Sequence, residues 1–176
     1  RVSRWNPKMK PYIFGKRNMI HIVDIKETFK GLLRAKKYVA KVVAEGQDVL
    51  FVGTKRQARN SIENHARRAQ MHFVRERWLG GTLTNFKTIR SRLARLEELE
   101  RLEESGELMQ NFSKKMISTL QREKRKIKQN LDGIRRMDRF PGVLVIVDVT
   151  HEIIALREAR KLGIPTICLI DTDGDP

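Results

Sequence analysis

The hydrophobic and polar positions of this chain follow two alternating periods along most of its length. Short apolar runs rich in β-branched residues are typical of buried strands, and the amphipathic segments between them have helical spacing. The predicted strands are residues 20–25, 48–53, 71–74, 143–149 and 164–170, and the predicted helices are residues 26–45, 55–69 and 152–162. This order of strands and helices predicts an α/β fold with a doubly wound parallel sheet flanked by helices.

Two features of the first half support this interpretation. The run at 48–53 is almost continuously apolar, as expected for a strand of a parallel sheet that is buried on both faces. The preceding helix, at 26–45, has Leu32, Leu33, Val39 and Val43 available for one face. These positions could form the packing face of that helix.

Two long polar helices, residues 86–104 and 112–131, interrupt the alternation and meet around Ser105 and Gly106. Their apolar positions approximate the spacing of a coiled-coil seam, so we predict an inserted antiparallel coiled-coil hairpin. The predicted seam residues are Ile89, Leu93, Leu96, Leu102, Met116, Leu120, Ile127 and Leu131. The first arm is rich in glutamate and the second in lysine and arginine, so the arms should attract each other. The hairpin is either a solvated brace or an arm that binds a partner, and its second arm could also face phosphate.

The charge of the chain narrows the class of partner. Lys and Arg number 37 against 21 Asp and Glu, which gives a formal net charge of +16 and a pI near 10.5. Such an excess points to a polyanionic partner. No run of 18 apolar residues is present, so a membrane is the weaker option. Cys168 is the single cysteine, which excludes an internal disulfide framework and fits a reducing, intracellular compartment.

The first eighteen residues differ from the rest in composition. Cations alternate there with Trp5, Tyr12 and Phe14, and Pro7 and Pro11 disfavour a helix, so we expect an extended segment that contacts nucleic acid. The first residue is Arg1 rather than Met, which indicates a processed or incomplete terminus. The expected division is a basic arm at 1–18, a sheet domain at 19–85 and 132–176, and a hairpin insertion at 86–131.

Two loops combine glycine with cations at the start of a helix. The turn at 53–57 follows a strand, and its backbone N–H groups, Lys55 and Arg56 converge where an anion could bind. It lacks the spacing of a P-loop or a dinucleotide fingerprint, so it supports a nucleotide enzyme only weakly. The second loop, at 77–86, reads Arg-Trp-Leu-Gly-Gly-Thr-Leu-Thr-Asn-Phe. It is either a surface that docks a phosphate backbone or a helix entry loop with Trp78 as an anchor.

Other candidate chemistries find less support. The four histidines are scattered without a paired zinc spacing, and no serine or cysteine lies in a nucleophile elbow. Asp148 and Glu152 could form a carboxylate pair, although helix capping explains them more simply. Asp171, Asp173 and Asp175 resemble the opening of a calcium loop, but a polar loop is the better interpretation. We therefore expect no catalytic residue and no metal site.

Six motifs in a fixed order give the chain a specific resemblance. They are Arg4-Trp5-Asn6-Pro7-Lys8-Met9, Pro11-Tyr12-Ile13, Ile20-His21-Ile22, Phe51-Val52-Gly53-Thr54-Lys55, Arg77 through Phe86, and Ile164-Pro165 through Asp171-Thr172. With these motifs the chain resembles the bacterial-type small-subunit ribosomal protein S-two family over almost its whole length. The family's glycine- and histidine-containing opening and its segment after Pro176 are absent here, and the family often has Asn at the position of Asp173.

The resemblance implies a flavodoxin-like parallel sheet with an inserted coiled-coil hairpin. It also implies a structural constituent of the small ribosomal subunit that binds rRNA, assists assembly and helps to retain the mRNA-binding protein S-one. Partners would be rRNA and neighbouring ribosomal proteins including S-one, with no cofactor, no membrane and no homo-oligomer. The expected location is the cytoplasm, in a bacterial ribosome, and an organellar ribosome fits the same residues.

The predicted rRNA-binding residues come from the matching motifs and their adjoining cations. They are Arg4, Trp5, Asn6, Lys8, Arg17, Lys55, Arg56, Arg77, Trp78, Gly80, Gly81, Thr82, Thr84 and Asn85. Phosphate contacts of this kind position a protein, and specificity would come from RNA shape and exposed bases. Two other hypotheses stay open at this point. One is an enzyme that binds a phosphorylated metabolite at Lys55, and the other is a scaffold whose hairpin recruits proteins without RNA.

Overall fold

A four-stranded parallel sheet forms the centre of the protein. The computed structural model describes residues 5–175, and the sheet comprises β3 (Val49–Val52), β4 (His72–Val74), β5 (Val143–Val147) and β6 (Thr166–Leu169). The strands lie in the order β4-β3-β5-β6, with Leu50 opposite both His72 and Leu144. The chain therefore fills the sheet outward in both directions from β3, which is the flavodoxin-like doubly wound order. The predicted fold class is confirmed.

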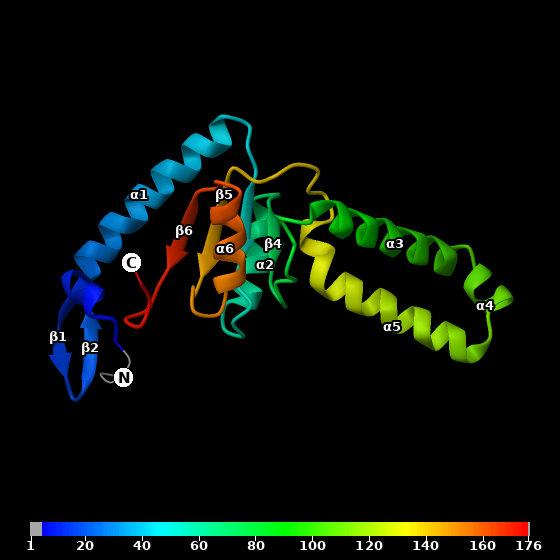
Figure 1. Cartoon of the computed structure of the whole chain (residues 1–176), viewed down its shortest axis with the longest axis horizontal. Coiled ribbons are helices and arrows are strands. Elements are labelled where there is room, and N and C mark those ends of the chain that lie inside the picture. The colour runs from blue at the N-terminus through cyan, green and yellow to red at the C-terminus, as the bar shows by residue number, and fades with distance from the viewer. Residues whose placement is uncertain (1–4, 176) are drawn as a thin grey trace.

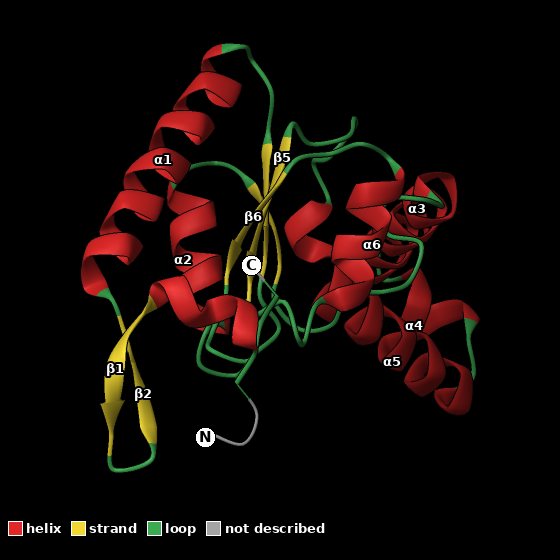
Figure 2. Cartoon of the chain, turned by 60° about the vertical axis from the view of Figure 1, so that its left-hand side comes forward, coloured by secondary structure: helices red, strands yellow, loops and turns green. Residues whose placement is uncertain are grey.

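Helices cover both faces of this sheet (Figure 2). On one side lie α1 (Ile25–Ala44) and α2 (Arg59–Arg68), and on the other lies α6 (Ile153–Lys161). Strand β5 shows why the run Val-Leu-Val-Ile-Val forms a buried strand. Leu144 and Ile146 pack in the cluster that contains Ala155 and Ala159 of α6, whereas Val143 packs with Val42 of α1. Alternate side chains of the strand thus pack on opposite faces of the sheet, and burial of each contributes about 1.5–3 kcal/mol to the stability of the fold.

Helix α1 departs from the expected packing. Asp24 caps its start by accepting a hydrogen bond from the Lys26 backbone N–H at 2.8 Å. Val42 is 4% exposed and meets the sheet, but Leu32 remains 64% exposed, and Leu33 and Val43 are exposed as well. Figure 1 shows the reason, because only the C-terminal end of α1 reaches the sheet while the rest runs away from it. The predicted packing face was therefore wrong for these three residues.

The N-terminal segment is extended only in part, because a 3₁₀ helix precedes its strand. Residues Pro7–Tyr12 form the 3₁₀ helix η2, which tolerates Pro7 in its first turn. Strand β1 (Ile13–Arg17) then pairs antiparallel with β2 (Ile20–Val23), and the turn between them holds Asn18 and Met19 at positive φ. The run predicted at 20–25 is a strand only over Ile20–Val23, since Ile25 already begins α1, and this strand joins the separate hairpin instead of the parallel sheet.

The inserted segment is an antiparallel pair of long helices that projects from the sheet (Figure 1). Helix α3 (Phe86–Glu104) leads through the short α4 (Glu107–Asn111) to α5 (Lys114–Leu131), and the 3₁₀ helix η3 (Asp132–Ile134) returns the chain to the sheet. Most predicted seam residues are buried, but Leu99 joins the seam and Met116 is 49% exposed. A coiled-coil geometry stays a prediction. Within residues 5–175, no helix is long and apolar enough to cross a membrane.

Candidate nucleic-acid interface

The loop at 77–85 closes around a carboxylate of the protein itself. Glu158 of α6 extends beneath the loop, where the Gly81 backbone N–H and the Trp78 indole Nε1–H donate to its Oε1 at 2.7 and 3.1 Å. Its Oε2 accepts the backbone N–H groups of Leu83 and Thr84, both at 3.0 Å, and the Thr84 hydroxyl at 3.1 Å. Five donors therefore converge on one side chain that is only 7% exposed.

This arrangement explains the residue types in the loop. Gly81 has a φ of +89°, a conformation that suits glycine and that helps aim the N–H groups of Gly81, Leu83 and Thr84 at one carboxylate. Trp78 is buried and supplies an indole donor from within the core. Thr82 is also buried, and its hydroxyl donates to the Leu79 carbonyl. The loop is thus a set of converging donors that binds Glu158, and Trp78 is anchored in the core, as the helix-entry interpretation of this sequence expects.

Hydrogen bonding keeps Glu158 ionised in a buried place. Burial by itself raises the pKa of a carboxyl group, but the donors of Thr84, Trp78 and Gly81 outweigh that effect. The pKa of Glu158 is consequently held below its ordinary value of 4.5. The loop and α6 are therefore joined by a charged contact whose strength depends on pH.

We expect this contact to make the protein acid-sensitive. Because the folded-state pKa of Glu158 is depressed, its stabilisation is fully present above the ordinary value of 4.5 and is lost as pH falls through the lower folded-state pKa. Urea unfolding measured from about pH 6 down to about pH 3 should show a decline that becomes shallower in Glu158→Gln. An identical decline in both proteins would show that Glu158 is not the group responsible.

The turn at 53–57 is also filled by carboxylates of this chain. The Thr54 backbone N–H donates to Glu152 Oε1 at 2.8 Å, and Lys55 Nζ lies 2.9 Å from Asp148 Oδ2. The hydrogen bond to Asp148 raises the pKa of Lys55. Burial raises the pKa of Asp148, but Thr150 and Lys55 lower it below its ordinary value. Glu152 makes no side-chain cap for α6, so the capping interpretation was wrong for this residue.

These contacts occupy the edge of the sheet where ligands of such folds bind. Strands β3 and β5 are neighbours from which the chain diverges in opposite directions, and the crevice beyond their carboxyl ends is the usual ligand site. Here Lys55 follows β3 and Asp148 follows β5, and they pair across that crevice. The charge of Lys55, which was expected to attract a phosphorylated metabolite, is paired within the protein, and this disfavours the enzyme hypothesis.

Two predicted residues of the N-terminal segment, Asn6 and Lys8, lie beside the C-terminal loop at Thr172 and Asp175. Arg4 lies outside the described residues. The Trp5 ring packs on His21 with centroids 4.8 Å apart, and the Asn6 side chain caps η2 by accepting the Lys8 backbone N–H at 3.0 Å. The Lys8 ammonium pairs with Asp175 at 2.9 Å. Within residues 5–175, no group of three or more His, Cys, Asp or Glu side chains could hold a metal ion.

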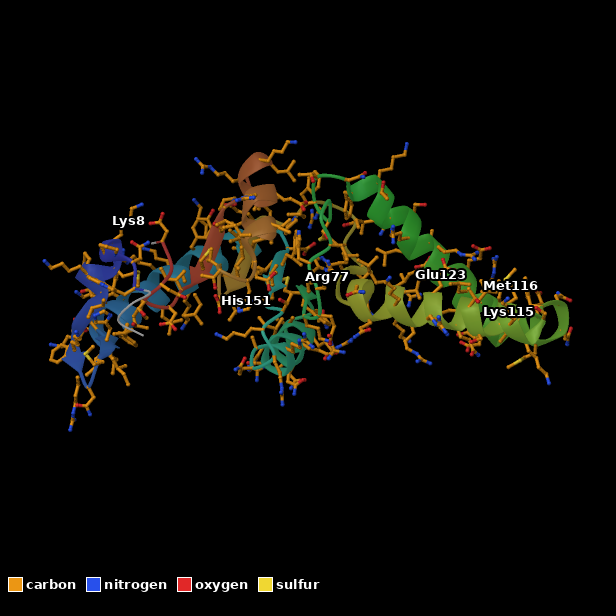
Figure 3. All side chains as sticks on the ribbon, turned by 60° about the horizontal axis from the view of Figure 1, so that its bottom comes forward. Lys8, Arg77, Lys115, Met116, Glu123 and His151 are labelled. Atoms are coloured by element: carbon orange, nitrogen blue, oxygen red, sulfur yellow. The ribbon has the colours of Figure 1, made fainter. Side chains whose placement is uncertain are left out.

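The remaining predicted residues differ in how much they expose. Arg17, Arg56 and Arg77 are exposed and have no acidic partner within 4 Å among residues 5–175. Gly80 is exposed, and Asn85 occupies the N-cap position of α3 without making the capping bond, because its side chain accepts the Thr88 hydroxyl instead. Figure 3 shows Arg77 near the junction of the sheet and the hairpin, and Lys8 at one end of the molecule.

Sequence reasoning did not single out Glu158. One signal was present, since an acid stands among the alanines and leucines at 155, 156 and 159 on what should be the buried face of a helix. A buried acid requires several donors, and the loop at 77–85 was the richest supply of them. The partners lie 74 to 80 residues apart in sequence, so only the fold brings them together.

Comparison with known proteins agrees with this architecture. The sequence profile of the family described as ribosomal protein S2 matches residues 1–176. The chain belongs to the ribosomal protein S2 family. It is 61% identical over 176 residues to the small ribosomal subunit protein uS2 of Rhodopirellula baltica, which covers 100% of this chain and 67% of that protein. Against the uS2 protein of Syntrophobacter fumaroxidans it is 49% identical over 175 residues, which covers 99% of this chain and 64% of that protein.

The chain therefore spans about two thirds of the length of these S2 relatives. The family predicted from the sequence motifs is confirmed. Membership in the S2 family supports a structural role in the small ribosomal subunit, in the cytoplasm, and not an enzymatic one. That conclusion agrees with the internal neutralisation of Lys55 at the sheet edge.

Proposed function

We propose that this chain is a structural constituent of the small ribosomal subunit that binds rRNA and assists subunit assembly. Its net charge of +16 carries the proposal, since so large an excess of cations requires a polyanion nearby. Family membership supports rRNA as that polyanion. The sheet would serve as a rigid frame that holds cations at fixed places, and neutralisation of phosphates would supply most of the affinity.

The predicted rRNA-binding residues divide into two roles under this proposal. Arg17, Arg56 and Arg77 are exposed and can reach phosphates directly. Trp78, Gly81 and Thr84 already donate to Glu158, so they would act by shaping the loop that presents Arg77, Gly80 and Asn85. Lys8 and Lys55 would have to exchange Asp175 and Asp148 for phosphate before they could contribute.

We further propose that the chain divides into a basic arm at 1–18, a sheet domain at 19–85 and 132–176, and a hairpin insertion at 86–131. The resemblance to the family also supports retention of protein S-one and contact with neighbouring small-subunit proteins, without self-association. In this arrangement the projecting hairpin (Figure 1) is free to reach beyond the site where the sheet domain is bound.

Sucrose-gradient sedimentation of gently lysed source cells tests the proposal. This chain should comigrate with small subunits and whole ribosomes and should resist moderate salt. Depleting it should lower the amount of S-one in the small-subunit fraction while the amounts of large-subunit proteins stay constant. Migration only as free protein would refute the ribosomal role, and unchanged S-one after depletion would refute retention alone.

A further inference from the structure

Helix α5 has two sides with different electrostatic environments. Leu120, Ile127 and Leu131 are buried against α3 and the base of the hairpin. At 100° per residue, a band about 120° wide on the far side of the helix holds the residues that we call the α5 outer strip. It comprises Lys115, Ser118, Thr119, Arg122, Arg125, Lys126 and Gln129, all of them exposed. The strip contains four cations, no acid and no large apolar side chain.

Several acids of the hairpin pair with cations that lie outside the strip. Glu100 accepts from Arg135 at 2.6 Å and lies 3.5 Å from Lys128, while Glu103 pairs with Lys124. The Glu123 carboxylate lies 3.6 Å from Arg95. Because these pairs satisfy the side of α5 that faces α3, the four cations of the strip have no acidic partner within 4 Å among residues 5–175.

The spacing of the strip fits a polyanion. From Lys115 to Lys126 the helix rises about 16 Å at 1.5 Å per residue, so four positive charges lie along one side of the helix. Hydroxyl and amide groups of Ser118 and Gln129 lie between and beyond them and can donate to phosphate oxygens. Figure 3 places Lys115 toward the tip of the hairpin, far from Lys8 at the other end. The strip would therefore contact a different stretch of RNA from that met by the N-terminal segment.

A membrane surface and a protein partner fit the strip less well than RNA does. A helix that lies on a membrane buries bulky apolar side chains, and the strip has none. Protein interfaces are depleted in Lys and enriched in aromatic residues at their centres, and the strip has two lysines and no aromatic ring. A cationic, polar surface along one side of a straight helix matches the phosphate backbone of structured RNA, where contacts need no reading of bases.

We propose that the α5 outer strip is an RNA-backbone binding surface, additional to the motif residues at 4–17, 55–56 and 77–85. The inference rests on the proposed function and specifies how the hairpin takes part in it. The strip neutralises phosphates at a distance from the sheet domain. The hairpin thus acts as a second point of attachment that fixes the orientation of the protein on rRNA.

The test compares two variants of the whole chain in binding to a small-subunit rRNA transcript over a series of salt concentrations. The strip variant carries Lys115→Gln, Arg122→Gln, Arg125→Gln and Lys126→Gln. The control variant loses the same four charges from exposed positions of α1, through Lys26→Gln, Arg34→Gln, Lys36→Gln and Lys37→Gln. All eight side chains are exposed, so both variants should unfold at nearly the same denaturant concentration as the unmodified chain.

For the strip variant, the magnitude of the negative slope of log affinity against log salt should decrease by roughly 3, since each lost phosphate contact removes roughly 0.7 to 0.9. The control should lose less than one unit. Equal losses of slope in the two variants, or an unchanged slope in the strip variant, would overturn the proposal. The proposed function would still stand in that case if RNA binding by the unmodified chain depends steeply on salt. If the unmodified chain binds without salt dependence, the proposed function itself fails. Retained RNA binding with lost binding to polyglutamate would assign the strip to acidic proteins and overturn the proposal.

Discussion

Replacing Glu158 with Ala should lower the free energy of unfolding by about 3–5 kcal/mol, because it removes the single acceptor of five converging donors. The Trp78 indole and the Leu83 N–H are buried, so they would lose their partner without gaining free access to water. Chemical denaturation at neutral pH measures the loss. A small domain usually has only 5–15 kcal/mol in total, so the variant should be near the limit of folding.

The variant Glu158→Gln tests whether the loop at 77–85 requires a negative charge or only a side chain of this shape. A glutamine amide keeps one carbonyl oxygen but turns the other acceptor into an NH₂ group, and both positions here face N–H donors. We therefore expect a loss of at least half that of the alanine variant. Glu104→Gln is the matched control, because Glu104 is exposed on α3 and should change stability by less than about 0.5 kcal/mol. A Glu158→Gln protein as stable as this control would show that the loop does not depend on a carboxylate.

The Glu158 contact also limits what a motif can show. The residues at 77–85 were read either as a surface that docks a phosphate backbone or as a helix entry loop anchored by Trp78, and their N–H groups converge on the carboxylate of Glu158. Residue types cannot tell whether the anion is a phosphate or a distant carboxylate, because the donors required are the same. The same ambiguity recurs at Thr54 and Lys55, which meet Glu152 and Asp148.

The fold was predictable for strands that are buried on both faces of the sheet, because this burial determines their sequence pattern. Strands such as β3 and β5 are apolar at every position because each face of the parallel sheet is covered, and that pattern has few alternatives. The path of α1 was not predictable in this way. Its apolar positions have the spacing of a packed helix, but how much of the helix reaches the sheet depends on the geometry of the flanking turns.

The N-terminal segment shows a related limit. Ile20 to Val23 has the composition of any strand, and whether it joins the central sheet or pairs with its neighbour depends on the turn that precedes it. Asn18 and Met19 adopt positive φ there, which reverses the chain tightly enough to pair β1 with β2. Met is an uncommon residue in that conformation, so its sequence gave little indication of a turn.

Gly133→Ala should destabilise the protein by about 2–3 kcal/mol, because a methyl group at this position has no space. The added Cβ would overlap the Phe73 carbonyl oxygen and lie 2.7 Å from a carbon of its ring. Phe73 belongs to β4, and Gly133 belongs to η3, where the hairpin returns to the sheet. The carbonyl cannot move away without disturbing β4, which pairs with β3 through Phe73 and Phe51.

Gly31→Ala makes the same chemical change as Gly133→Ala, but we expect it to raise the stability of the protein instead of lowering it. Gly31 lies within α1, and no atom lies within 4 Å of a Cβ added there, so alanine should stabilise the helix by about 0.5–1 kcal/mol. Thermal unfolding of the two variants should therefore shift in opposite directions. If Gly133→Ala were neutral, β4 and the base of the hairpin could separate without loss, and the hairpin would not be held rigidly against the sheet. Orientation of the α5 outer strip on RNA requires that rigidity, since a second attachment point aligns a protein only when it is fixed relative to the first.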